Sequence, residues 1–155
     1  MADVVLEAEQ PRDAAAVDDV VRRAFPDHVE VADMVAGIRR SPRYEPGLAF
    51  VARSAGTVVG FVMLSRVDVV DDDLTRHQVL SLTPLAVAPD RQRQGIGSAL
   101  VRTAVASADA RGDQVVVLEG SPGFYGRLGF TYAPDQGITL DLPDWAAREA
   151  AQVTC

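Results

Sequence analysis

Two glycines, Gly95 and Gly97, stand where an apolar run gives way to a helical pattern, and Arg91 and Arg93 precede them. Backbone N–H groups at the start of a helix have no partner within that helix, and the helix dipole adds partial positive charge there. Glycine has no side chain that would keep an anion away from those N–H groups. The stretch therefore predicts an anion site suited to phosphate.

Other interpretations of this turn make different demands on the sequence. Glycines also serve tight strand-to-helix connections that bind nothing, and the glycines alone do not separate the two uses. A P-loop requires Gly-Lys-Ser/Thr, which this turn lacks. A dinucleotide fingerprint requires a third glycine and a helix that follows the first strand, whereas four predicted strands precede this helix. These two nucleotide sites are therefore excluded.

The elements around the turn follow from the spacing of apolar residues. Apolar positions at helical spacing predict a helix over 96–110, which Gly112 ends. A strand over 79–87 leads into the turn, and its Pro84 cannot donate to a sheet ladder, so we expect a bulge or one-sided pairing there. The continuous apolar run 114–118 predicts a strand buried on both faces.

The remaining pattern predicts further helices and strands on both sides of this centre. They are a strand over 4–8, a helix with Asp13 as its N-cap, a helix over 31–38, strands over 48–52 and 58–67 joined as a hairpin, a short helix over 124–128, and strands over 130–133 and 138–142. The order predicts a mixed α/β fold with helices over a central sheet. No linker divides residues 1–155, so we expect a single domain. The aspartate-rich stretch 68–77 is expected to be a solvated loop rather than a metal site.

Composition limits the partners. Fifteen Lys and Arg against 22 Asp and Glu give a net charge of −7, and an acidic surface repels nucleic acid and anionic membranes. No apolar run is long enough to span a bilayer, and the first residues lack the regions of a signal peptide. The one cysteine, Cys155, excludes an internal disulfide. A cytoplasmic protein is therefore the simplest expectation.

Around the glycines the sequence resembles the GNAT superfamily of N-acetyltransferases. The family signature Gln/Arg-x-x-Gly-x-Gly/Ala is matched by residues 92–97, which follow a Pro-Leu-Ala-Val-x-Pro strand. Residues 118–130 are similar to the Leu-Glu-Gly-x-Pro-x-x-Tyr-x-Arg-x-Gly-Phe of a small bacterial branch of predicted N-acetyltransferases. The two segments together, in this order, are strongly specific, and the resemblance extends over most of the chain.

The resemblance implies a fold and a cosubstrate. The fold is a central mixed, mostly antiparallel sheet with helices on both faces. The cosubstrate is acetyl-coenzyme A (acetyl-CoA), with no metal. In the family, backbone amides of the turn hold the diphosphate of coenzyme A (CoA), and the strand before it pairs with the pantetheine arm. The residues so implied are Leu85, Ala86 and Val87 for the arm and Gln92, Arg93, Gln94, Gly95, Ile96, Gly97 and Ser98 for the diphosphate.

The resemblance also indicates which groups move protons. Tyr125 matches the family tyrosine before Gly-Phe, and a phenol with a pKa of about 10 stays protonated and can donate to the departing thiolate. The alternative is a packing tyrosine. Related proteins often carry Tyr-Tyr where this chain has Phe124-Tyr125, so Tyr125 stands alone. Glu119 is the candidate base, since burial would raise its pKa, or else it orients the loop. Some relatives recruit water, and Ser81 and Thr83 could help relay a proton.

These residues predict an N-acetyltransferase that moves an acetyl group directly from acetyl-CoA to a primary amine. The acceptor, a small molecule or a peptide, is not identified by the sequence. Two other functions use the same fold: a sensor that binds CoA or acyl-CoA without turnover, and a scaffold with no ligand. Retention of Tyr125 argues against the first, and the intact glycine turn argues against the second. The oligomeric state is left open, a homodimer included.

Overall fold

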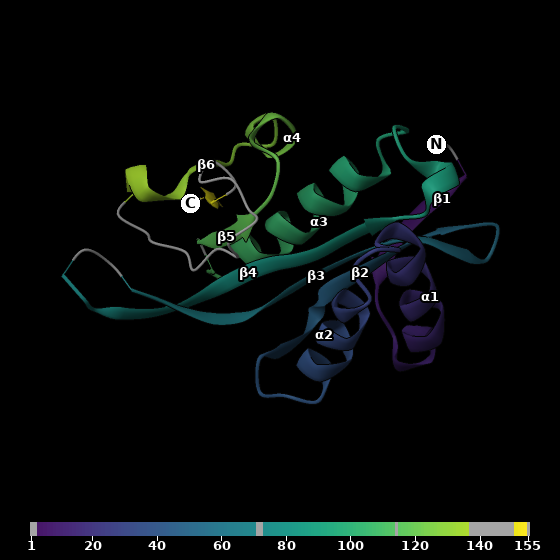
Figure 1. The fold of residues 1–155 in the computed structure, drawn as a ribbon, viewed down its shortest axis with the longest axis horizontal. Helices are drawn as coiled ribbons and strands as arrows, with labels where there is room; N and C mark the ends of the chain where they lie inside the picture. The colour runs from purple at the N-terminus through teal and green to yellow at the C-terminus, as the bar shows by residue number, and fades with distance from the viewer. Residues whose placement is uncertain (1–2, 71–72, 114, 137–150, 155) are drawn as a thin grey trace.

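The computed structural model describes residues 3–70, 73–113, 115–136 and 151–154. Its centre is one seven-stranded sheet in the order β1-β2-β3-β4-β5-β7-β6 (Figure 1). The strands are β1 (Val4–Ala8), β2 (Tyr44–Ser54), β3 (Thr57–Val70), β4 (Arg76–Val87), β5 (Val116–Glu119), β6 (Thr131–Tyr132) and β7 (Ala151–Thr154). β4 and β5 pair in parallel and the other neighbours pair antiparallel, which confirms the mixed, mostly antiparallel sheet.

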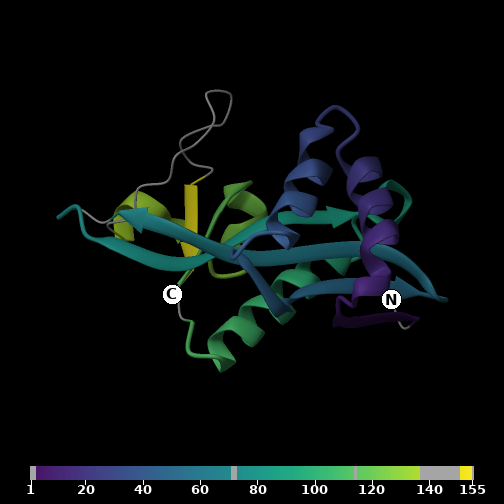
Figure 2. The ribbon, with the colours of Figure 1, turned by 90° about the horizontal axis from the view of Figure 1, so that it is seen from below.

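Helices cover both faces of the sheet, as expected. They are α1 (Ala14–Ala24), α2 (Glu30–Arg39), α3 (Ile96–Ala110) and α4 (Pro122–Gly126), with short 3-10 turns at Pro11–Asp13, Pro89–Arg91 and Ala133–Gln136. α1 and α2 lie on one face and α3 lies on the other (Figure 2). α1 contacts β3 and β4, while α3 contacts β2, β3 and β4. Among the described residues, no helix combines the length and the apolar character that crossing a membrane requires.

α3 sits close to the sheet because β3 carries a glycine beneath it. A Cβ built at Gly60 would come within 2.9 Å of Leu100 Cδ1 and 3.1 Å of Ile96 Cγ2. Both α3 residues are buried, together with Ala104 and Ala108 on the same face. The absence of a side chain at Gly60 thus lets the first turns of α3 rest on the strand next to β4. The helix begins and ends where the apolar spacing predicted.

The aspartate-rich stretch differs at both ends from the loop predicted over 68–77, while residues 73–75 lie outside the strands as predicted. β3 continues to Val70 and β4 begins at Arg76, with Val67 opposite Val79 in the ladder. Val69 is buried in a small second core with Val117, Ala133 and Val153. Asp68, between the two valines, is exposed. Side chains alternate along a strand, so the charged residues can face solvent while the valines are buried. Burial of the valines therefore favours strand over loop in this segment.

Four local details also bear on the predictions. The register shifts between Val62 and Leu64 of β3, opposite Pro84, which confirms the expected bulge. α4 begins earlier than predicted because the Ser121 hydroxyl accepts a hydrogen bond from Phe124 N at 3.4 Å. Asp13 precedes α1, but its carboxylate accepts from Gln10 N at 2.8 Å instead of capping that helix. β7 was not predicted, and the predicted strand 138–142 lies outside the described residues.

Candidate active site

β4 and β5 run side by side for only a short distance. Their parallel ladder joins Leu80 to Val116 and Ser81 to Val117. Beyond this point β4 continues toward α3 along the edge of β3, while the chain after β5 turns into α4. Two walls therefore diverge from a common base, one carried by β4 and the other by α4.

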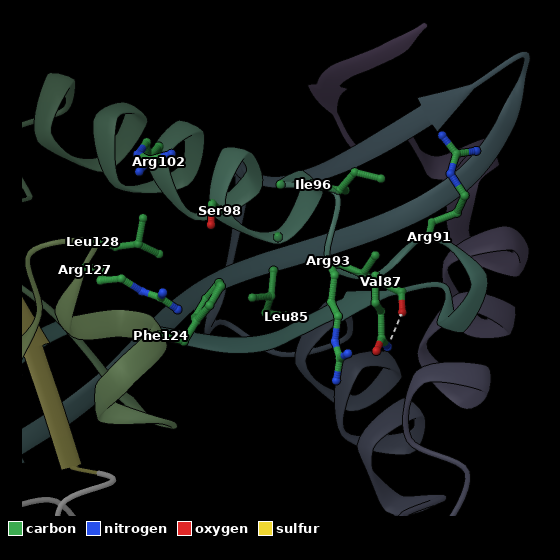
Figure 3. Close-up of a pocket in the computed structure, with 13 residues that line it drawn as sticks. Leu85, Val87, Arg91, Arg93, Ile96, Ser98, Arg102, Phe124, Arg127 and Leu128 are labelled. Atoms are coloured by element: carbon green, nitrogen blue, oxygen red, sulfur yellow. Dashed lines mark hydrogen bonds between the residues drawn. The ribbon is translucent and has the colours of Figure 1, made fainter. Parts of the chain in front are cut away.

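A cavity of about 690 Å³ lies between these walls and the start of α3 (Figure 3). Its lining comprises Leu85, Val87, Arg91, Gln92, Arg93, Gly95, Ile96, Gly97, Ser98, Arg102, Phe124, Arg127 and Leu128. Eight of the ten predicted cofactor-binding residues are among them. Ala86 is not, because alternation along β4 turns its methyl away from Leu85 and Val87 into the core. Gln94 is not either, and its side-chain oxygen accepts from Arg91 Nε at 3.3 Å.

The turn before α3 presents backbone N–H groups to this cavity. Gly95 is the N-cap residue of α3 and has a φ of +86°, in the left-handed region that glycine adopts without strain. The first bond of the helix runs from Ala99 N to Gly95 O at 3.0 Å, so the N–H groups of Gly97 and Ser98 precede the helical ladder. A Cβ at Gly97 would lie 3.6 Å from both Leu85 Cδ2 and Val87 Cγ2. Gly97 therefore leaves open the space between the helix start and β4.

Four arginines line the cavity of this acidic protein. Arg91 is held by Ser54, whose Oγ accepts from Arg91 Nη1 at 3.2 Å. In the part of the chain that the structure describes, Arg93, Arg102 and Arg127 form no ion pair with a carboxylate. The combination of free cations and helix-start N–H groups favours an anionic ligand.

Tyr125 lies beside the cavity without lining it. Its side chain is 9% exposed. Its ring meets those of Phe124 and Phe130 edge-on, with centroids 4.8 and 5.6 Å apart. Burial raises the pKa of the phenol to about 12, because the phenolate would lose its hydration. No described residue is hydrogen-bonded to the Tyr125 hydroxyl, so its proton is not committed to any other described group.

Glu119 is the last residue of β5, opposite Ala151 of β7. It is exposed and does not line the cavity. Its carboxyl is nevertheless partly desolvated by the surrounding chain, which raises its pKa. Ser81 lies across the β3–β4 ladder from Ser65, whose buried hydroxyl has no hydrogen-bond partner among the described residues. The candidate base Glu119 and the candidate relay residue Ser81 therefore lie near the β4–β5 ladder, and neither lines the cavity that carries the arginines.

Sequence reasoning missed four lining residues: Arg102, Phe124, Arg127 and Leu128. Arg102 could have been found, because it follows Ser98 by four positions and so shares its face of α3. The other three depend on where α4 lies relative to α3, which local patterns do not specify. Within the described residues, no three His, Cys, Asp or Glu side chains gather in a group that could hold a metal ion.

Comparisons with known proteins agree with this geometry. Residues 14–130 match the model of the acetyltransferase (GNAT) family. The chain is 34% identical over 140 residues to the "uncharacterized N-acetyltransferase YhbS" of Escherichia coli K12, covering 90% of this chain and 81% of that protein. It is 33% identical over 132 residues to the "uncharacterized N-acetyltransferase YjhQ" of the same organism, covering 84% of this chain and 72% of the other.

Solved structures show the same architecture. Escherichia coli YhbS, solved in complex with CoA, superposes with a TM-score of 0.84 at 28% identity, covering 98% of this chain and 81% of that one. A GNAT family acetyltransferase from Brucella melitensis, solved with acetyl-CoA, gives a TM-score of 0.73 at 25% identity, covering 98% and 95% of the two chains. The chain thus belongs to the acetyltransferase (GNAT) family, which confirms the acetyltransferase class that its glycine turn and tyrosine segment predicted.

Proposed function

We propose that this protein transfers an acetyl group from acetyl-CoA to a primary amine of a small-molecule or peptide acceptor. The observation that carries the proposal is the cavity at the start of α3, where Gly97 leaves helix N–H groups accessible beside arginines that have no carboxylate partner within the described part of the chain. The CoA and acetyl-CoA complexes of the two structural relatives support the same cosubstrate here. β1 and β7, from opposite ends of the chain, join one sheet, which supports a single domain over residues 1–155.

The cavity fits the two chemically different parts of CoA. Its diphosphate matches the N–H groups at the start of α3 and the nearby Arg93. Its pantetheine arm matches the edge of β4 over Leu85, Ala86 and Val87. These residues pair with β3 on one side, while the β4–β5 ladder stops short of them on the other. An extended amide-bearing arm can use such backbone groups as a strand would.

Direct transfer requires few changes of bonding. The acceptor nitrogen forms a bond to the acetyl carbonyl carbon and loses one proton, while the bond from that carbon to sulfur breaks and the thiolate gains one proton. Binding both reactants in one place replaces an encounter in solution, which lowers the entropic part of the barrier. The net protonation of the protein is unchanged once both proton transfers are complete.

Tyr125 is our candidate for the proton donor. A phenol with a pKa of about 12 remains protonated at neutral pH, and no described residue is hydrogen-bonded to its hydroxyl. Because α4 follows β5 directly, Tyr125 lies on the wall opposite β4. Its donation to a developing thiolate would be general acid catalysis.

Glu119 is our candidate for the base. Partial desolvation raises the pKa of its carboxyl, and a higher pKa makes the carboxylate a stronger base toward the proton of the amine. A water molecule held by backbone carbonyls would do the same work if Glu119 only orients the loop after β5. In either case the protonated amine has to lose a proton before its nitrogen can attack the acetyl carbonyl carbon.

Two measurements test the function. Isothermal titration with CoA should show binding at the cavity. A thiol-release assay with acetyl-CoA, run against amines, amino acids and peptides, should identify an acceptor whose product is an N-acetyl amide. Binding without thiol release across the amines would favour the sensor over the enzyme. No binding of CoA or acetyl-CoA to folded protein would contradict the proposal.

A further inference from the structure

The arginines of the cavity form two separate groups. Figure 3 shows Arg91 and Arg93 toward one end, where β4 meets α3, and Arg102 and Arg127 toward the other. The first group belongs to the glycine turn. The second is contributed by the middle of α3 and by the residue that follows α4. Two cationic groups in one cavity indicate a ligand with anionic groups at two places.

The second group is exposed and takes no part in the ion pairs of the described residues. Elsewhere in the protein, buried or half-buried arginines meet carboxylates, as Arg53 meets Asp13 at 2.9 Å and Arg66 meets Asp113 at 2.6 Å. Arg102 and Arg127 have no such partner among the described residues. Both side chains are exposed, so water and salt screen their mutual repulsion, and an anion bound between or beside them would interact favourably with both.

The spacing along α3 relates the two groups. Arg102 follows Ser98 by four residues, which places both on one face of the helix with an axial separation of about 6 Å. Ser98 belongs to the turn that would hold a diphosphate. A second phosphate on the same face, one helical turn further on, therefore lies within reach of the Arg102 guanidinium. Arg127 approaches from α4 and points toward the cavity beside Phe124 (Figure 3).

A neighbouring cavity of about 360 Å³ continues along α3 and shares Arg102 and Leu128 with the first. Its wall includes Asp109 and Asp113, which disfavour an anion there. An anionic group recognised by Arg102 is thus confined to the first cavity, on the side where Arg127 also lies.

We propose that Arg102 and Arg127 bind the 3′-phosphate of CoA, so that this protein selects the complete cofactor over its 3′-dephosphorylated precursor. The inference rests on the proposed use of acetyl-CoA. In CoA the 3′-phosphate and the diphosphate are attached to one ribose ring, which matches two anion subsites separated by one helical turn. Guanidinium groups bind phosphate through paired N–H donors, and two of them can share its three terminal oxygens.

The test is titration of wild-type protein with CoA and, separately, with 3′-dephospho-CoA. We expect CoA to bind at least about tenfold more tightly, the effect of one lost hydrogen-bonded charge contact. In the Arg102→Ala/Arg127→Ala double variant this ratio should fall to one, through weaker binding of CoA and little change for the dephosphorylated ligand. Each single variant should give an intermediate ratio. Both side chains are exposed, so the fold should persist, which melting temperatures would verify.

Arg76→Ala is the matched control, since it removes the same charge at the start of β4, at the opposite end of the strand from the cavity, and it should retain the wild-type ratio. Equal affinity of the wild type for the two ligands would overturn the inference and leave the proposed function standing. Retention of the ratio in the double variant would also overturn it. Failure of both ligands to bind would contradict the proposed function as well.

Discussion

Gly120 leaves the space that the Tyr125 ring occupies: a Cβ at Gly120 would come within 2.9 Å of Tyr125 Cδ2. Gly120 directly follows β5, and Tyr125 lies on α4. The glycine thereby allows α4 to fold back over the end of the strand that carries Glu119. The placement of Tyr125 near the end of the strand that carries Glu119 thus depends on the absence of a side chain at Gly120.

Replacement of Gly120 by alanine should move the Tyr125 ring. The added methyl overpacks the site, and we expect a loss of about 1–3 kcal/mol in the free energy of unfolding. Turnover should fall as well, while CoA affinity stays near the wild-type value because neither residue lines the cavity. Gly126→Ala in α4 is the control, since nothing lies within 4 Å of a Cβ there. Thermal melts and thiol-release rates on both variants make the comparison. A Gly120→Ala protein with normal rate and stability would contradict this packing.

Tyr125→Phe keeps the ring and removes only the hydroxyl. If Tyr125 protonates the thiolate, and chemistry limits turnover, the rate should fall about ten- to a thousand-fold with nearly constant CoA affinity. The hydroxyl makes no hydrogen bond to a described residue, so the melting temperature should change little. Rate, affinity and melting temperature are to be measured on one preparation. A normal rate would make Tyr125 a packing residue and assign the proton to water.

Glu119→Gln should change the pH profile of the reaction. A base acts in its deprotonated form, and the pKa of Glu119 is raised. The wild-type kcat/KM should therefore decline as pH falls through that pKa, at a higher pH than for an ordinary glutamate. The glutamine variant should lose this decline and be slower by about a hundred- to ten-thousand-fold. The profile is measured with saturating acetyl-CoA. An unchanged profile in the variant would indicate that water takes the proton.

Gly97→Val tests the opening at the start of α3. Its Cβ would be in ordinary contact with Leu85 and Val87, at 3.6 Å, so the fold should tolerate the change. The rest of the side chain would occupy space in front of the helix N–H groups, and CoA binding should be lost in titrations. Gly95→Val should lose binding and stability together, because Gly95 has a φ of +86° that valine adopts only with strain. Wild-type affinity in a folded Gly97→Val protein would exclude the diphosphate from this turn.

The Asp113→Asn substitution should lower the free energy of unfolding, and the loss should be largest at neutral pH. Arg66 donates two hydrogen bonds to the Asp113 carboxylate, at 2.6 and 3.0 Å, and this lowers the pKa of that carboxyl. A lowered folded-state pKa gives stability that is present above the ordinary carboxyl pKa and lost as pH falls through the lowered one. We expect a loss of about 1 kcal/mol at pH 7, shrinking in acid. Urea denaturation along a pH series measures it, and a pH-independent difference would contradict the assignment.

What the sequence could predict depended on how local each signal is. α3 was predicted over its full length because Gly95 and Gly112 bracket an uninterrupted apolar face. The stretch around Asp68 was misread because its charges lie on the solvent side of a strand whose other side buries valines. The roles proposed for Arg102 and Arg127 depend on α3 and α4 lining one cavity. That arrangement joins segments distant in the chain, so no window of sequence contains it.

Because β7 lies between β5 and β6, this part of the sheet can be completed only after the last described residues have been synthesised. β1 to β4 pair with neighbours in sequence and can join as each leaves the ribosome. β7 pairs with β5 on one side and with β6 on the other, and β6 pairs with no other described strand. The wall that carries Glu119 and Tyr125 therefore gains its outer support only when residues 151–154 have been synthesised. A nascent chain would present the candidate phosphate turn before the wall that carries the candidate proton donor and base is complete.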